Sequence, residues 1–207
     1  MLEKIKILIV DDHAILRVGL ASVLNTFEDL RVVGDAESGK DIAAKAMSLR
    51  PDVVIMDLMM PDVDGVEATK DLLCAVPDTN VLILSTFATS DKISEALSAG
   101  ATGAILKNAE IQELASAIRT VADGGRYIQD ELRRILVKDP PVQSLSARQQ
   151  EILEAMARGL TSADIAKQLG ISHDMVREHA TALYRKIGAA NRTEAVAIAL
   201  RKHLLKI

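Results

Sequence analysis

Short apolar runs alternate with longer helical patterns along the first 125 residues. Most of these runs are rich in Val and Ile and lack polar interruptions, which is typical of strands buried on both faces of a parallel sheet. The pattern predicts strands near 5–10, 30–35, 52–57, 80–85 and 103–106, and helices near 14–26, 38–49, 65–75, 90–99 and 110–123. Five consecutive βα units predict an α/β domain over residues 1–125 with a five-stranded parallel sheet.

The remainder of the chain has a different character. Residues 126–143 contain one possible short helix at 131–137 and a break at Asp139-Pro140-Pro141, and we interpret this stretch as a linker. The pattern from Leu145 onward is wholly helical and predicts an all-α domain over residues 144–207. Its four expected helices begin after the cap residues Ser146, Thr161, Ser172 and Asn191. The middle two are joined only by Gly170-Ile171-Ser172, the short turn of a helix-turn-helix.

The charge differs between the two parts. Residues 1–125 hold 11 Lys and Arg against 20 Asp and Glu, a net charge of −9, whereas residues 126–207 hold 14 against 9, a net charge of +5. A basic second domain suits a polyanionic partner, although two ordinary charged surfaces would give the same counts. The single cysteine, Cys74, excludes a disulfide framework. No apolar segment approaches ~20 residues, so we expect a cytoplasmic protein without a membrane partner.

Polar side chains end four of the predicted strands. Asp11-Asp12, Asp57, Ser85 and Lys107 each follow an apolar run. Because parallel strands end at the same edge of a sheet, these groups are expected to converge there. Three neighbouring carboxylates favour a hard divalent cation, Mg²⁺ or Mn²⁺. Asp57 suits a nucleophile for a phosphoryl group, and Lys107 would neutralise charge on the transferring oxygens.

Residues 1–125 resemble the receiver domain of two-component response regulators. The resemblance rests on four motifs, which are Asp11-Asp12, DVVIMDLMMPDVDG (52–65), Ser85 and GATGAILK (100–107). It implies a flavodoxin-like (βα)5 fold. It also implies that Asp57 is the phosphoacceptor for a sensor histidine kinase. Asp11, Asp12 and Asp57 would hold Mg²⁺ together with the backbone carbonyl of Met59.

The resemblance gives Ser85 the position of the switch hydroxyl and Lys107 that of the conserved lysine. Two departures concern this switch. Ala104 stands where the family often has an aromatic residue, so a swinging ring cannot operate there. Thr86 is bulkier than the Ala often found beside the switch hydroxyl, and we expect it to crowd the phosphoryl group and slow its loss.

Residues 145–207 resemble the LuxR-type helix-turn-helix of the NarL/FixJ class. The matching stretches are LSARQQEIL (145–153), GLTSADIAKQLGIS (159–172), MVREH (175–179) and KIGAANRTEAV (186–196). Gln149 replaces the usual Glu, which could weaken an interaction with Arg148. The expected recognition helix, 173–187, presents Arg177, Thr181, Tyr184 and Arg185 on one face, with Glu178 beside it. These residues except Tyr184 are predicted DNA contacts, and Lys186 and Arg192 are predicted phosphate contacts.

Together these features predict a phosphorylation-controlled transcription regulator rather than an enzyme. Phosphorylation would favour a homodimer that reads an inverted repeat in double-stranded DNA. The last helix would serve either as a dimer contact or as part of the domain core. Two alternatives remain open, namely a DNA-binding regulator independent of phosphorylation and a Mg²⁺-dependent phosphohydrolase with Asp57 as nucleophile. The four histidines show no metal-binding spacing, and we expect them at the surface or in packing.

Overall fold

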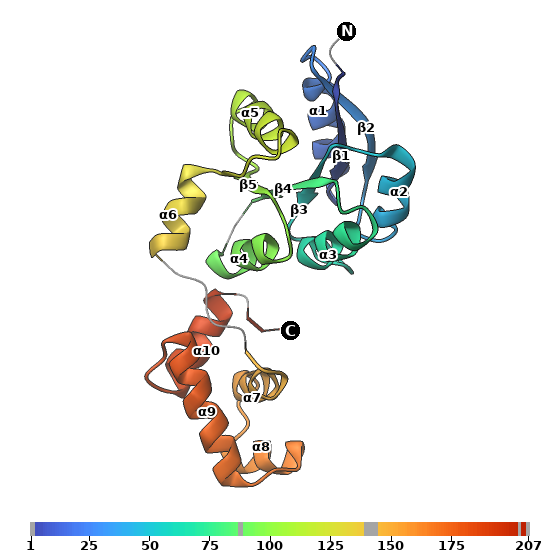
Figure 1. Cartoon of the computed structure of the whole chain (residues 1–207). Coiled ribbons are helices and arrows are strands. Elements are labelled where there is room, and N and C mark those ends of the chain that lie inside the picture. Colours follow the sequence, from blue (N-terminus) through green and yellow to red (C-terminus); the bar gives the residue numbers. More distant parts are fainter. Residues whose placement is uncertain (1–2, 87–88, 139–144, 203, 206–207) are drawn as a thin grey trace. The chain divides into compact units, whose positions relative to one another are not determined.

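The computed structural model describes residues 3–86, 89–138, 145–202 and 204–205 (Figure 1). The chain divides into two compact units, Met1–Asp139 and Pro140–Ile207. Within the described ranges, no helix is both long enough and apolar enough to span a membrane.

The first unit is a parallel sheet with helices on both faces. Its strands are β1 (Ile5–Val10), β2 (Leu30–Ala36), β3 (Val53–Asp57), β4 (Asn80–Ser85), β5 (Gly103–Leu106) and β6 (Tyr127–Ile128). Its helices are α1 (Ala14–Leu24), α2 (Ile42–Leu49), α3 (Gly65–Ala75), α4 (Ser90–Ser98), α5 (Ile111–Ala122) and α6 (Asp130–Lys138). The strand order is β2-β1-β3-β4-β5-β6, and every described pair is parallel.

Successive side chains of a strand point to opposite faces, and here both faces are covered. Ile7 and Ile9 of β1 pack in one buried cluster with α1 and α5, whereas Leu8 and Val10 pack in a second cluster with α2, α3 and α4. The same helix arrangement is visible in Figure 1. This two-sided burial explains why the strands read as continuous apolar runs.

The end of the first unit differs from the expectation of five strands followed by a linker over 126–143. Tyr127–Ile128 pairs with β5 as a sixth strand, and α6 packs against α4 and β5. Leu132 of α6 is fully buried in the same cluster as Ile128. Residues 126–138 therefore belong to the first unit, and the remainder of the expected linker, 139–143, lies outside the described residues.

The second unit consists of α7 (Ala147–Ala157), α8 (Ser162–Leu169), α9 (His173–Ile187) and α10 (Arg192–Arg201). The hydroxyls of Ser146, Thr161 and Ser172 accept backbone hydrogen bonds at the starts of α7, α8 and α9, and the Asn191 side chain does so for α10. These caps satisfy N–H groups that a helix cannot pair internally. Gly170 adopts a left-handed conformation (φ 63°) between α8 and α9, which permits the tight turn of the helix-turn-helix.

The core of the second unit is built from the apolar faces of all four helices. Ile152, Ile165, Val176 and Leu183 are fully buried in it. Gln149 does not pair with Arg148, because its side chain completes a capping box with Ser146 and Arg148 pairs with Glu151. Gln149, which stands where the family usually has Glu, therefore caps the start of α7.

Candidate functional site

Parallel pairing aligns the ends of β1, β3, β4 and β5 at one edge of the sheet. Asp11, Asp57, Ser85 and Lys107 lie at these ends. The backbone N–H of Lys107 donates to the carbonyl of Ser85 over 2.8 Å, which fixes these two residues side by side. The predicted convergence therefore occurs in the structure.

Lys107 bridges the two most deeply buried carboxylates. Its Nζ lies 2.6 Å from Oδ2 of Asp11 and 2.8 Å from Oδ2 of Asp57. The side chains of Asp11 and Asp57 are only 1% and 3% exposed. Burial raises the pKa of Asp57, and the hydrogen bond from Lys107 only partly opposes this effect. Burial disfavours the Lys107 ammonium, yet its hydrogen bonds to Asp11 and Asp57 outweigh burial and raise the pKa of Lys107.

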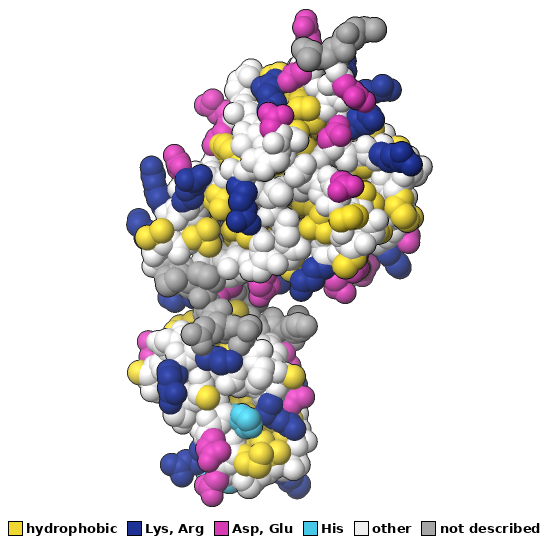
Figure 2. Space-filling view, in the orientation of Figure 1, with side chains coloured by type: hydrophobic (Ala, Val, Ile, Leu, Met, Phe, Trp, Pro, Cys, Tyr) yellow, Lys and Arg dark blue, Asp and Glu magenta, His cyan; other side chains and the backbone are white. Residues whose placement is uncertain are grey.

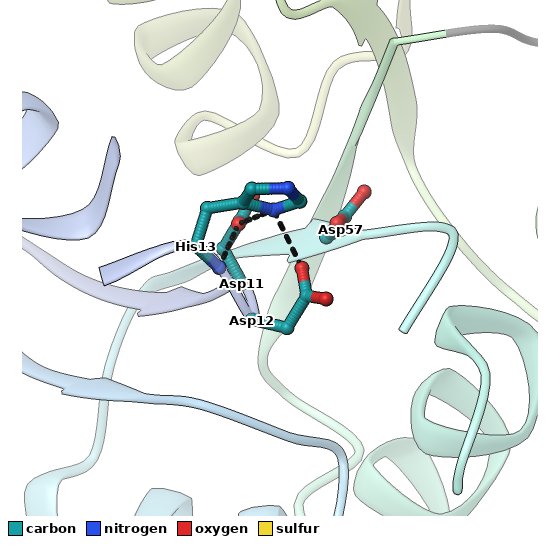
Figure 3. Close-up of side chains that lie close together, drawn as sticks. All are labelled: Asp11, Asp12, His13 and Asp57. Carbon is teal, nitrogen blue, oxygen red and sulfur yellow. Dashed lines mark hydrogen bonds and ion pairs between the residues drawn. The ribbon is translucent and has the colours of Figure 1, made fainter. Parts of the chain in front are cut away.

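Asp12 and His13 complete the group (Figure 3). His13 Nδ1 lies 2.6 Å from Oδ1 of Asp12 and 3.1 Å from Oδ1 of Asp11. One ligand atom from each of Asp11, Asp12, His13 and Asp57 lies within 4.8 Å of all the others. His13 lies at the surface, as expected, with its ring 67% exposed, but the structure also places it beside these carboxylates. The turn after β1 brings His13 to the carboxylates. Residues that are adjacent in the sequence do not show the spacing by which a metal-binding motif is recognised.

The loop that follows Asp57 is held close to the sheet. The N–H of Gly65 donates to the carbonyl of Leu58 over 3.0 Å, and a Cβ on Gly65 would collide with the carbonyl oxygen of Asp57. Only glycine fits this approach. The N–H of Met59 donates to Oδ1 of Asp57 over 3.4 Å, which places Met59 beside the carboxylate. Its expected carbonyl ligand role stays a prediction.

Ser85 and Thr86 occupy contrasting environments. Ser85 is fully buried, and its Oγ has no hydrogen-bond partner among the described residues. Thr86 is exposed at the same edge. A buried hydroxyl without a partner is costly, so Ser85 is available to a group that enters the site.

Ala104 is fully buried in the cluster that contains Leu132, so a small residue here leaves space for the packing of α6.

The residues at this edge fit a divalent cation and a phosphoryl group. Asp11, Asp12 and Asp57 supply the oxygen ligands that hard cations prefer. The three carboxylates and the Lys107 ammonium leave two formal negative charges, which one divalent ion would balance. The unpartnered hydroxyl of Ser85 adds a donor for a phosphoryl oxygen.

The second candidate site is α9. Arg177, Glu178, Thr181 and Arg185 are exposed along this helix, as a DNA-reading face requires. The hydroxyl of Thr181 donates to the carbonyl of Arg177 over 2.8 Å, which leaves its oxygen and methyl for contacts. Charged side chains of both signs are scattered over the visible face of each unit, so a single-sign patch does not dominate this view (Figure 2).

Two predicted neighbours of this face are engaged inside the second unit. Tyr184 packs on the core, and its hydroxyl contacts Sδ of Met156 over 3.8 Å. A guanidinium N–H of Arg192 donates to the Met156 carbonyl over 2.9 Å. Tyr184 is therefore not part of the open polar face. Arg192 has an internal partner, and its phosphate contact stays a prediction, as does that of the half-buried Lys186.

Comparisons with known proteins identify the family of each unit. The family model described as response regulator receiver domain matches residues 7–119. The model described as bacterial regulatory proteins, luxR family, matches residues 143–199. The response regulator protein VraR of Staphylococcus aureus is 35% identical over 207 residues, which cover 98% of this chain and 99% of that protein. The chain belongs to the response-regulator family.

Other relatives cover nearly the full length of this response regulator. The transcriptional regulatory protein YxjL of Bacillus subtilis is 34% identical and covers 99% of both chains. The crystal structure of the response regulator ChrA of a heme-sensing two-component system shares 36% identity, with a TM-score of 0.59 over 99% of this chain and 100% of ChrA. The RcsB–DNA complex shares 24% identity and the fold, with a TM-score of 0.71 over 96% of this chain and 98% of RcsB.

These findings define the general activity of this response regulator. It combines a receiver with a LuxR-type DNA-binding domain and is a DNA-binding transcription regulator. YxjL is named as a transcriptional regulatory protein as well, and that the chain is not an enzyme stays a prediction.

Proposed function

We propose that Asp57 accepts a phosphoryl group from a sensor histidine kinase, and that phosphorylation promotes a homodimer that binds an inverted repeat in double-stranded DNA. The observation that carries the proposal is the environment of Asp57. Its carboxylate, 3% exposed, ends the central strand β3 and contacts an ammonium, with two further carboxylates nearby. A buried ion pair is weak evidence for a role in stability, because well-packed hydrophobic residues of similar volume are often at least as stabilising.

The transfer would use one oxygen of Asp57 as nucleophile. That oxygen bonds to phosphorus while the bond from phosphorus to the kinase histidine nitrogen breaks, and the nitrogen keeps the electron pair. Asp11, Asp12 and Asp57, with the carbonyl of Met59, would hold Mg²⁺ or Mn²⁺, which supplies positive charge to the phosphoryl oxygens. Lys107 already contacts Asp57, so its ammonium is placed to stay with the acyl phosphate.

Two groups at the sheet edge would respond to the new phosphoryl group. The unpartnered Oγ of Ser85 can donate to a phosphoryl oxygen and thereby favour one position of the β4–α4 loop. An aromatic switch is absent because Ala104 stands at its place. Gln129 offers a different connection, since its Oε1 accepts from the N–H of Leu106, one residue before Lys107, and it directly precedes α6. Phosphorylation would then act by shifting populations of these elements.

The DNA-binding step would place α9 in the major groove. Arg177 and Glu178 project from its N-terminal half and are exposed, where base edges can be reached. The last helix, α10, directs Ala195 and Ala199 into the domain core, and Leu200 is its large exposed apolar side chain, 53% exposed. Burial in the domain core thus explains most of the apolar residues of α10. The dimer contact would need more surface than the apolar residues that α10 leaves exposed.

Intact-protein mass spectrometry tests the proposal. The full-length chain is incubated with Mg²⁺ and a small acyl phosphate, beside the Asp57→Asn variant. We expect one added phosphoryl group in the wild type only, followed by a larger mass in light scattering and tighter binding to an inverted repeat. A folded, Mg²⁺-loaded protein that stays unmodified would refute the proposal and favour DNA binding independent of phosphorylation. Sustained release of inorganic phosphate from phosphoesters would favour the phosphohydrolase alternative.

A further inference from the structure

The ring of His13 lies in the carboxylate group and contacts Asp11 and Asp12 through Nδ1. His13 is the N-cap residue of α1, but its side chain makes no capping hydrogen bond. The ring is 67% exposed, so it contributes little to the core. Its Nδ1 nevertheless points at the carboxylates of Asp11 and Asp12, with Asp57 across the site (Figure 3).

We propose that His13 is a ligand of the metal site and shifts its preference toward late first-row divalent ions such as Co²⁺, Ni²⁺ and Zn²⁺. The inference rests on the metal role proposed above for Asp11, Asp12 and Asp57. His13 would add a nitrogen ligand to a set that otherwise contains only oxygen ligands. The site would then favour a class of ion that the carboxylates alone do not select.

The distances suit this role. Ligand bonds of about 2.0–2.1 Å in an octahedral site place neighbouring ligand atoms about 3.0 Å apart. His13 Nδ1 lies 3.1 Å from Oδ1 of Asp11, which matches that separation, and 2.6 Å from Oδ1 of Asp12. Asp12 is 30% exposed, so its carboxylate has room to move outward by the small amount required.

The turn that carries the three residues is already held in place. The N–H of Asp11 donates to the carbonyl of Ala36 over 3.1 Å, and Arg17 donates to the carbonyl of Asp11 over 2.7 Å. The N–H of His13 donates to Oδ1 of Asp11 over 2.8 Å, which orients that carboxylate toward the ring. A metal can therefore bind without rearrangement of this backbone.

The choice of ion follows from ligand chemistry. Mg²⁺ takes oxygen ligands and gives up water reluctantly, whereas imidazole suits Zn²⁺, Ni²⁺ and related ions. Most sites bind these ions more tightly than Mg²⁺ even without a nitrogen ligand. The informative quantity is therefore the ratio of Co²⁺ to Mg²⁺ affinity and its change when the imidazole is removed.

Isothermal titration calorimetry of the full-length protein with Co²⁺ and with Mg²⁺ measures this ratio. The variants are His13→Ala and His13→Phe, of which the second keeps a ring without nitrogen. The control is His173→Ala, because His173 is also exposed but lies at the start of α9 in the other unit. Asp57→Asn establishes which site the ion occupies. Proton NMR of the Co²⁺ form detects paramagnetically shifted imidazole signals.

The proposal predicts that both His13 variants lower the Co²⁺-to-Mg²⁺ affinity ratio at least about tenfold and lose the shifted imidazole signals, whereas His173→Ala changes neither. An unchanged ratio in the His13 variants would overturn it, as would Co²⁺ affinity that is undiminished in Asp57→Asn. Failure of Asp57 to accept a phosphoryl group would refute the proposed function alone, since these titrations involve no phosphoryl donor.

Discussion

Replacement of Lys107 by Met removes the ammonium that contacts Asp11 and Asp57 but keeps a side chain of similar length. The two carboxylates are 1% and 3% exposed, so water can replace only part of the lost contacts at 2.6 Å and 2.8 Å. Removal of one partner from a buried ion pair costs about 3–5 kcal/mol. Because Asp12 opens one side of the site to water, we expect the low end, a loss of about 3 kcal/mol at neutral pH without metal.

The loss should depend on pH with a definite sign. Burial raises the pKa of Asp57 above its ordinary value of 3.8 even with Lys107 present, and loss of the ammonium should raise that pKa further. A carboxyl whose pKa is raised in the folded state contributes stability below its ordinary pKa and loses it as the pH rises through the folded value. The variant should therefore approach the wild type near pH 4 and fall behind it toward neutral pH.

Urea unfolding of the full-length chain at pH 4.5 and 7.5, with a chelator present, measures this difference by circular dichroism. The control variant Lys107→Arg keeps the positive charge, and the unfolding of the second unit provides an internal reference. Addition of Mg²⁺ should restore part of the loss, since an ion that binds only the folded state stabilises it. Equal stability of Lys107→Met and wild type at pH 7.5, or a deficit independent of pH, would refute the electrostatic account.

Four further predictions concern other parts of the molecule. Leu132→Ala should lower the unfolding free energy of the first unit by about 2–4 kcal/mol in urea titrations, whereas Val137→Ala, at a position 81% exposed, should change it by less than about 0.5 kcal/mol. Gly65→Ala should weaken Mg²⁺ binding in calorimetry, because the added methyl collides with the backbone of Asp57. Arg177→Ala should cost about 1–3 kcal/mol on a specific DNA site in mobility-shift titrations, and equal weakening on random DNA would make it a phosphate contact. Thr86→Ala should shorten the lifetime of the phosphorylated form in timed mass spectra, and an unchanged lifetime would contradict crowding by Thr86.

The sequence predicted the elements whose signals are long or repeated. The first five strands and all four C-terminal helices were predicted because apolar runs, cap residues and terminal glycines agree with one another. The strand ends also predicted the meeting of Asp57 with Lys107, since parallel topology alone brings them to one edge.

The missed features lack a local signal. Tyr127–Ile128 is a strand of only two residues, which no periodicity can reveal. A short helix at 131–137 was predicted as possible, but its packing into the first unit through the fully buried Leu132 was not. The closeness of His13 to the carboxylates was not predicted, because a turn rather than a spacing brings it there. Tyr184 lies at the border between the polar and apolar faces of α9, and its long ring reaches Met156.

The inclusion of α6 in the first unit also determines how strongly two copies would cooperate on DNA. Only residues 139–144 separate the described end of α6 from Leu145, and an extended chain from Lys138 to Leu145 spans at most about 25 Å. In the proposed dimer, each DNA-binding unit would be held on a short tether. Once one unit occupies its half-site, the other meets the second half-site at an effective concentration on the order of millimolar. Much of the affinity gained on dimerisation would then come from the shortness of this tether, without any new contact to DNA.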